Sequence, residues 1–377
     1  MCRVFLFLLL SSTLGLFSQR GKNGSVVISV ANTIVNLYTP LTSNAVAGTK
    51  TLTVQSSLSY SVGDLIFIIQ MQGASVNAGK DSIYPDLTSS IPTNTTFGAI
   101  TNYNNCGNNE YHQISSIPNA TSIVLDCGLK YNYDYLSKVQ VIKVPRYLDL
   151  TLNGTGSITC PTWNGSVGGI AIIETKNNCI LNSTPSFSVT GKGFRGGGFE
   201  NATNFGGNKY GSLKANEGAY KGESIAGDTT RYKVYSAVFG RGAIANGGGG
   251  ACVHNGGGGG GANGGNVLVY DGYGNPVSGY TNAWNLESPS FSTHTSSGGG
   301  RGGYTFSNSN ANVNTAAPGS SSWGADNRNN VGGFGGRPLN YSTGKLFLGG
   351  GGGSGDGNES QLGQGGNGGG MVYIICY

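Results

Sequence analysis

The distribution of glycine constrains this 377-residue chain more than any other feature. Of its 68 glycines, 15 precede residue 191 and 53 lie in residues 191–377, with uninterrupted runs at 247–250, 256–261 and 349–353. Glycine loses more backbone entropy on folding than any other residue, so isolated polyglycine is expected to be disordered. A folded glycine-rich half must therefore satisfy its backbone polar groups through neighbouring segments.

Two interpretations of residues 191–377 stay open. A flexible, linker-like coil is the simpler one. Apolar segments interrupt the glycine runs at 267–270, 345–348 and 371–375, however, and a linker has no need of them. Polyproline-II-type helices have three residues per turn and no internal hydrogen bonds, so glycine helices of this kind can bond to one another as a bundle. We expect an ordered bundle, closed by the strand-like C-terminus.

The first half of the chain has the pattern of β-structure. Short runs rich in Val, Ile, Thr and Tyr recur between turn residues, and residues 51–54 and 139–144 alternate apolar with polar side chains, as half-buried strands do. Residues 65–69 are continuously apolar, which predicts a strand in the middle of a sheet. The predicted fold is all-β. A β-sandwich or short β-solenoid spans residues 25–190, and a glycine-rich domain of polyproline-II-type helices and short strands spans 191–377.

The N-terminus has the order of a secretory signal peptide. Arg3 precedes an almost wholly apolar stretch at 4–16, which is followed by small and polar residues. The apolar stretch is too short to span a bilayer, and no later segment is long and apolar enough to do so. We expect residues 1–18 to be removed and the mature chain, without an integral membrane segment, to be secreted or at the cell surface.

Charge is sparse in this chain. Charged residues are 10% of the sequence and the formal net charge is +5, without any block of Lys or Arg. A nucleic-acid partner is therefore not expected. The compartment instead favours a surface polysaccharide or another cell-surface protein as the partner.

Loss of the signal peptide removes Cys2 and leaves an even number of cysteines. In an oxidising compartment this pattern favours disulfides, and pairing of sequence neighbours would join 106 to 127, 160 to 179 and 252 to 376. Buried free thiols are the alternative. No Cys/His spacing predicts a zinc site, and we expect no cofactor. The disulfide candidates are Cys106, Cys127, Cys160, Cys179, Cys252 and Cys376.

Catalytic motifs are weak. Residues 222–226 approximate a nucleophile elbow around Ser224, with Asp271 and His294 following in the order that α/β-hydrolases use. That elbow requires a strand-to-helix turn over a parallel α/β sheet, and the sequence shows no such pattern. His112, His254 and His294 are interpreted as ordinary loop or turn residues. The prediction is a protein that is not an enzyme and has no catalytic residues.

Aromatic residues among polar neighbours are the better candidates for binding. Tyr131, Tyr133 and Tyr135 alternate with Asn and Asp, and Tyr304 and Trp323 lie among Gly, Ser and Asn. Rigid aromatic faces beside amide groups can stack on sugar rings and hydrogen-bond their hydroxyls. The same rings could instead fill gaps between glycine helices, which have no side chains of their own.

Several segments, taken in order, resemble a known family. They include Thr33-Ile-Val-Asn-Leu-Tyr-Thr-Pro40, Gly63-Asp-Leu-Ile-Phe-Ile-Ile-Gln-Met-Gln-Gly73 and Lys221-Gly-Glu-Ser-Ile-Ala-Gly227. The chain is similar to secreted glycine-rich surface proteins that are common in the Bacteroidetes and often form the N-terminal part of large adhesin-like proteins. The resemblance implies an exported, non-enzymatic structural or adhesin-like surface module. An extracellular carbohydrate-binding accessory domain or carbohydrate-active enzyme is the alternative.

Overall fold

The structure is a computed structural model that describes residues 19–79, 97–200, 209–252, 256–264, 300, 302–303, 332–357 and 363–377. The predicted signal peptide lies outside these residues. Within them β-strands dominate, and the one α-helix, α1, is short (Thr229–Val234). The expected mainly-β fold is confirmed.

The first unit is a set of three parallel sheets with the topology of a short β-solenoid. Each sheet has three strands, one from each of three successive turns, and the strand of the second turn lies between the other two. Apolar side chains such as Ile28, Leu150 and Ile173 are buried between the sheets. The sheets consist of β1 (Val26–Ile28), β12 (Leu150–Leu152) and β15 (Cys179–Leu181); β2 (Thr33–Ile34), β13 (Ile158–Thr159) and β16 (Phe187–Ser188); and β11 (Arg146–Tyr147), β14 (Ile170–Thr175) and β17 (Met371–Cys376).

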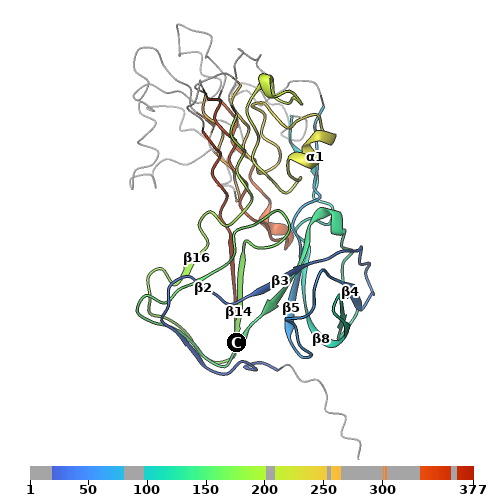
Figure 1. Cartoon of the computed structure of the whole chain (residues 1–377), viewed down its shortest axis with the longest axis vertical. Helices are drawn as coiled ribbons and strands as arrows, with labels where there is room; N and C mark the ends of the chain where they lie inside the picture. Colours follow the sequence, from blue (N-terminus) through green and yellow to red (C-terminus); the bar gives the residue numbers. More distant parts are fainter. Residues whose placement is uncertain are drawn as a thin grey trace, which may run out of the picture.

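An antiparallel sheet is inserted within the first turn of this solenoid, between β2 and β11 (Figure 1). It curls into a half-barrel, and a bridge between Leu41 and Val54 brings its two edges together. Residues 25–190 therefore combine parallel sheets with a curled antiparallel half-barrel, where a β-sandwich or a short β-solenoid was expected. In spatial order the strands are β3 (Leu37–Pro40), β10 (Val139–Val144), β5 (Leu65–Gln70), β8 (Asn109–Asn119), β9 (Ser122–Leu125) and β4 (Thr51–Thr53); β6 (Ser75–Val76) and β7 (Ile100–Asn102) form a separate ribbon.

Strand β5 shows why the run at 65–69 is continuously apolar. It lies between β10 and β8, as a strand in the middle of a sheet should. Ile66 and Ile68 pack inside the half-barrel, whereas Phe67 and Ile69 pack on the opposite face against the core shared with the glycine-rich half. Because both faces are buried, an alternating pattern would place polar groups in a core. The prediction of a central strand is confirmed.

The glycine-rich segments run side by side above the β half (Figure 1) and are held by backbone hydrogen bonds. Along residues 349–356, amides three apart donate to one neighbouring segment, and the next amide donates to a different one. The three acceptor segments are 363–369, 256–262 and 220–223. Hydrogen-bond directions thus repeat every three residues, so each segment can be surrounded by several others.

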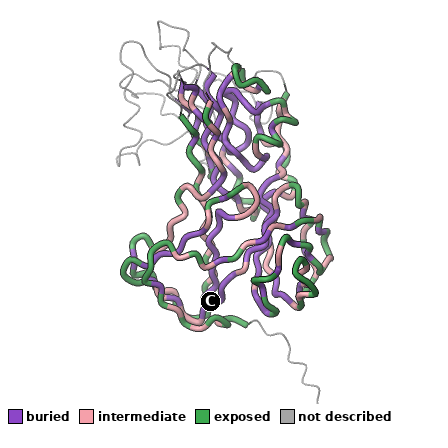
Figure 2. Tube along the Cα trace, in the orientation of Figure 1, coloured by how far each residue is buried: buried purple, intermediate pink, exposed green. Residues whose placement is uncertain are grey.

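At many positions these segments approach too closely for even a Cβ atom. A Cβ on Gly351 would lie 1.8 Å from the carbonyl oxygen of Arg195, and one on Gly353 would lie 2.0 Å from that of Gly249. Figure 2 shows the segments buried along much of their length. The close approach of neighbouring backbones therefore explains the glycine content. Packed backbone segments form much of the interior of this half.

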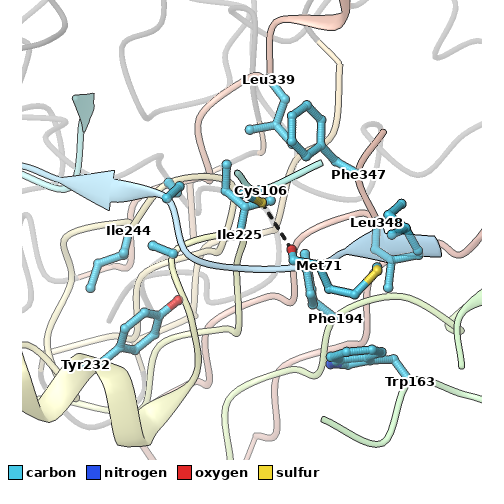
Figure 3. Packing of buried hydrophobic residues seen from close by; sticks show 14 of the residues in the cluster. Met71, Cys106, Trp163, Phe194, Ile225, Tyr232, Ile244, Leu339, Phe347 and Leu348 are labelled. Carbon is cyan, nitrogen blue, oxygen red and sulfur yellow. Dashed lines mark hydrogen bonds between the residues drawn. The ribbon is translucent and has the colours of Figure 1, made fainter. Parts of the chain in front are cut away.

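The two halves share one hydrophobic core. Phe67 and Ile172 of the sheets pack in the same cluster as Phe194, Ile225 and Leu348 of the glycine-rich half, part of which Figure 3 shows. Strand β17, which follows the last glycine run, pairs in parallel with β14 along its six residues. The C-terminal strand of the glycine-rich half thus belongs to the solenoid, in agreement with its interpretation as a closing element.

A buried carboxylate connects the halves at this boundary. One oxygen of Glu223 accepts hydrogen bonds from the Gln72 amide (2.7 Å) and the Trp163 indole (3.0 Å). The other accepts from the backbone and guanidinium of Arg195. Glu223 therefore connects the half-barrel, the solenoid and the first glycine-rich segment through one side chain.

Adjacent glycines test the close approach of the segments. A Cβ on Gly365 would lie 2.0 Å from the Gly352 carbonyl oxygen, whereas one on Gly366 meets nothing within 4 Å. We expect Gly365→Ala to lower the free energy of unfolding by about 1–3 kcal/mol through overpacking. Gly366→Ala should leave it unchanged or raise it by up to about 1 kcal/mol. Urea denaturation measures both, and equal effects would contradict the packing described.

The contacts of Glu223 predict that two neighbouring carboxylates differ in their contribution to stability. Glu223→Gln replaces an acceptor of four hydrogen bonds by a neutral amide and leaves buried donors unsatisfied, so we expect a loss of at least about 2 kcal/mol in stability. Asp228→Asn is the matched control, because it removes only the partly exposed ion pair to Arg195 and keeps the cap of α1. It should cost less than about 1 kcal/mol. Thermal unfolding of both variants measures the two stability losses, and equal losses would contradict the role given to Glu223.

Candidate functional site

The tyrosines proposed for binding do not form one exposed face. Tyr135 is 38% exposed and Tyr131 is partly buried, but Tyr133 is only 2% exposed and packs in the core of the half-barrel. The prediction that Tyr133 is a surface binding residue is therefore wrong, because its ring packs in the hydrophobic interior of the half-barrel. Tyr304 and Trp323 lie outside the described residues.

The six cysteines in the described part of the chain are free thiols, and the expected disulfides between sequence neighbours are not formed. Cys106 and Cys252 are buried, and their thiols donate to the carbonyls of Met71 and Lys209. Cys160 is buried as well, and Cys179 is partly buried. Cys127 lies beside His112, and Cys376 receives a hydrogen bond from Thr175. Cys160 and Cys179 belong to the same hydrophobic cluster but are not bonded to each other.

The structure places Ser224, the centre of the weak elbow motif, in the interior. Its side chain is fully buried, and its hydroxyl oxygen accepts hydrogen bonds from the Tyr232 hydroxyl (2.8 Å) and the Ala226 amide (3.1 Å). It has the role of a structural residue under α1. Asp271 and His294, the other members of the weak motif, lie outside the described residues.

The side-chain cluster with the clearest chemistry surrounds His112, in the half-barrel. Glu110 and His112 are two residues apart on β8, so their side chains lie on one face of the strand. Asp126 and Cys127 directly follow β9, the partner of β8 in the hairpin. The hairpin therefore brings the two pairs together. In the described part of the chain, His112, Asp126 and Cys127 are the group whose ligand atoms, within 4.8 Å of one another, could hold a metal ion.

Both nitrogens of the His112 ring have partners. Nε2 lies 2.7 Å from Oε2 of Glu110, whereas Nδ1 lies 3.3 Å from Oδ1 of Asp126 and 3.4 Å from the Cys127 thiol. The ring is buried, and Asp126 and Cys127 are exposed. The cluster thus has a buried, carboxylate-bound side and an open side where Nδ1, the thiol and a carboxylate converge.

Charges control protonation in this cluster. Burial alone would lower the pKa of His112, but hydrogen bonds and charges from Glu110 and Asp126 outweigh it and raise the pKa above its usual value. Burial and the Asp126 charge raise the pKa of Cys127. A thiol whose pKa is raised is a weak nucleophile at neutral pH. The geometry therefore does not favour Cys–His catalysis.

Sequence reasoning missed this cluster because it treated His112 as a loop residue and paired Cys127 with Cys106. The alternation of Glu110 and His112 was the available signal. This alternation indicates a site only once the β8–β9 hairpin places Asp126 and Cys127 beside His112.

Comparisons with known proteins give little further information. No protein-family model matches the chain, and no curated protein matches it. Among solved structures, similarity is found to the tailspikes of Pseudomonas phage phi297, of Acinetobacter baumannii bacteriophage AP22 in complex with a capsular saccharide, and of Pseudomonas phage LKA1. Identities are 13%, 13% and 12%, and TM-scores are 0.19, 0.21 and 0.19. The matches cover 42%, 43% and 42% of this chain but only 21%, 30% and 29% of the tailspikes.

No helix among the described residues has the length and apolar character needed to cross a membrane.

Thiol accessibility tests the cysteine environments. In the folded, metal-free protein, iodoacetamide at mildly alkaline pH should alkylate the exposed Cys127 and Cys376. It should modify the buried Cys106, Cys160 and Cys252 only after unfolding. Mass spectrometry of peptides, with and without prior reduction, provides the measurement. Labelling of Cys106 or Cys252 in the folded state would contradict their burial.

Proposed function

We propose that this protein is an exported, non-enzymatic structural module of the adhesin-like type, acting at the cell surface or in the surrounding medium. The repeating backbone hydrogen bonds of residues 349–356 are the observation that carries the proposal. They indicate that the glycine-rich half is a built platform whose interior leaves no room for a ligand between its segments. The solenoid and half-barrel are its base.

The platform consists, in this proposal, of polyproline-II-type glycine helices. Such a helix has three residues per turn, and the donors of residues 349–356 change direction with the same period. A strand would instead alternate between two directions. Bonding in three directions supports a bundle, which gives a narrow and stiff support with few side chains.

Carbohydrate binding is the second candidate, and Tyr135 supports it. Its ring is exposed at the start of the 3-10 helix η1 (Tyr135–Ser137), and Asp134 caps that helix through the Leu136 amide. An exposed aromatic ring beside fixed polar groups suits a sugar ring. An extracellular carbohydrate-active enzyme belongs to the same alternative, and release of sugar distinguishes it from a binding module.

Export and binding are tested separately. The full chain expressed in a bacterial host should be recovered from the medium or the cell surface, and a variant lacking residues 1–18 should stay in the cells. Retention of the full chain would contradict export.

The purified chain without residues 1–18 should bind a polysaccharide or a cell surface saturably, without releasing reducing sugar. Tyr135→Ala, Tyr304→Ala or Trp323→Ala should weaken polysaccharide binding about threefold to tenfold, the effect of losing one aromatic contact of about 0.5–1.5 kcal/mol. The exposed Tyr377 provides the control substitution, Tyr377→Ala. Time-dependent release of sugar would overturn the non-enzymatic proposal.

A further inference from the structure

We infer that His112, Asp126 and Cys127 form a zinc site at the open end of the β8–β9 hairpin. This inference is independent of the proposed surface function. Nitrogen, carboxylate oxygen and thiolate sulfur are the atoms that zinc binds in proteins. Three of these ligands converge here on one exposed position.

The distances between ligand atoms fit a tetrahedral ion. Zinc bonds of about 2.0–2.3 Å require ligand atoms about 3.3–3.6 Å apart along an edge of the tetrahedron. Nδ1 of His112 lies 3.3 Å from the Asp126 oxygen and 3.4 Å from the Cys127 sulfur. Two edges of the tetrahedron thus already have the required length, and the Asp126 and Cys127 ligand atoms lie within 4.8 Å of each other.

Glu110 supplies an independent argument. Its carboxylate lies 2.7 Å from Nε2 of His112, and it is itself fixed by the backbone amides of Lys130 and Tyr131. A proton held on Nε2 leaves the lone pair of Nδ1 directed at the thiol and Asp126. Metal-binding histidines are commonly oriented by a carboxylate on the other nitrogen in this way.

Asp126 is also positioned before any metal arrives. Its Oδ1 accepts hydrogen bonds from the backbone amides of Gln113 (3.2 Å) and Cys127 (3.0 Å). One thiolate and one carboxylate neutralise the dipositive ion, and His112 binds as a neutral ring. Because Asp126 and Cys127 are exposed, the fourth position faces solvent, as in zinc sites that bind water or an exchangeable ligand.

Cobalt(II), a spectroscopic substitute for zinc, tests the site in the full mature chain prepared without a histidine tag. We expect one Co²⁺ per chain with a thiolate charge-transfer band in the near ultraviolet, and displacement of that band by Zn²⁺. Cys127→Ala should abolish the band, whereas Cys376→Ala, at the other exposed thiol, should leave it intact. Glu110→Gln should weaken Zn²⁺ affinity about 10–100-fold without removing the band.

A second measurement uses the unaltered protein. Stoichiometric Zn²⁺ should slow iodoacetamide labelling of Cys127 and leave labelling of Cys376 unchanged. The site is overturned if the protein shows no thiolate–cobalt band, if Cys127→Ala keeps it, or if Zn²⁺ protects both thiols equally. Unchanged affinity in Glu110→Gln would overturn the positioning role of Glu110.

Discussion

Backbone hydrogen bonding between glycine segments is the interaction on which the rest of this structure depends. Side chains usually fill a protein interior, but here carbonyls and amides of neighbouring segments meet directly. Each glycine loses more entropy on folding than another residue would. The bonds of one segment to three others offset that cost together, because a single pair of segments would leave many backbone groups unsatisfied.

The β half supplies what such an interior lacks. Glycine offers no apolar side chain to bury, so the hydrophobic stabilisation comes from the β half together with the apolar residues between the glycine runs, such as Phe334 and Leu348. Trp163 and Phe194 meet edge to face at the boundary, with ring centroids 5.9 Å apart, beside the buried carboxylate of Glu223. The boundary thus combines apolar burial, to which both halves contribute side chains, with a carboxylate whose hydrogen bonds are satisfied.

Sequence reasoning succeeded where one local pattern has one structural cause. The run at 65–69 predicts β5 because burial on two faces requires it, and the apolar residues after the last glycine run predict β17. The half-barrel within the solenoid was not predictable, because its partners are far apart in sequence: β10 pairs with β3 and β5.

The His112 cluster escaped prediction for the same reason. Its residues follow no recognised spacing and meet only through the register of β8 against β9. Disulfides predicted from sequence proximity are not formed: Cys106 is buried whereas Cys127 is exposed, and Cys160 and Cys179 share a hydrophobic cluster as free thiols. Local sequence patterns therefore do not reveal which distant segments pair in this fold.

The pairing of β17 with β14 has a mechanical consequence. The glycine-rich half leaves the solenoid after β16 and returns before β17, and the Gly370 amide donates to the Val189 carbonyl at the point where the two ends meet. Tension applied along the chain at β17 passes into β14 through six paired residues loaded in shear. Because β17 also continues directly into residues 363–370, this pairing shares with the covalent backbone a load that the glycine segments would otherwise carry alone.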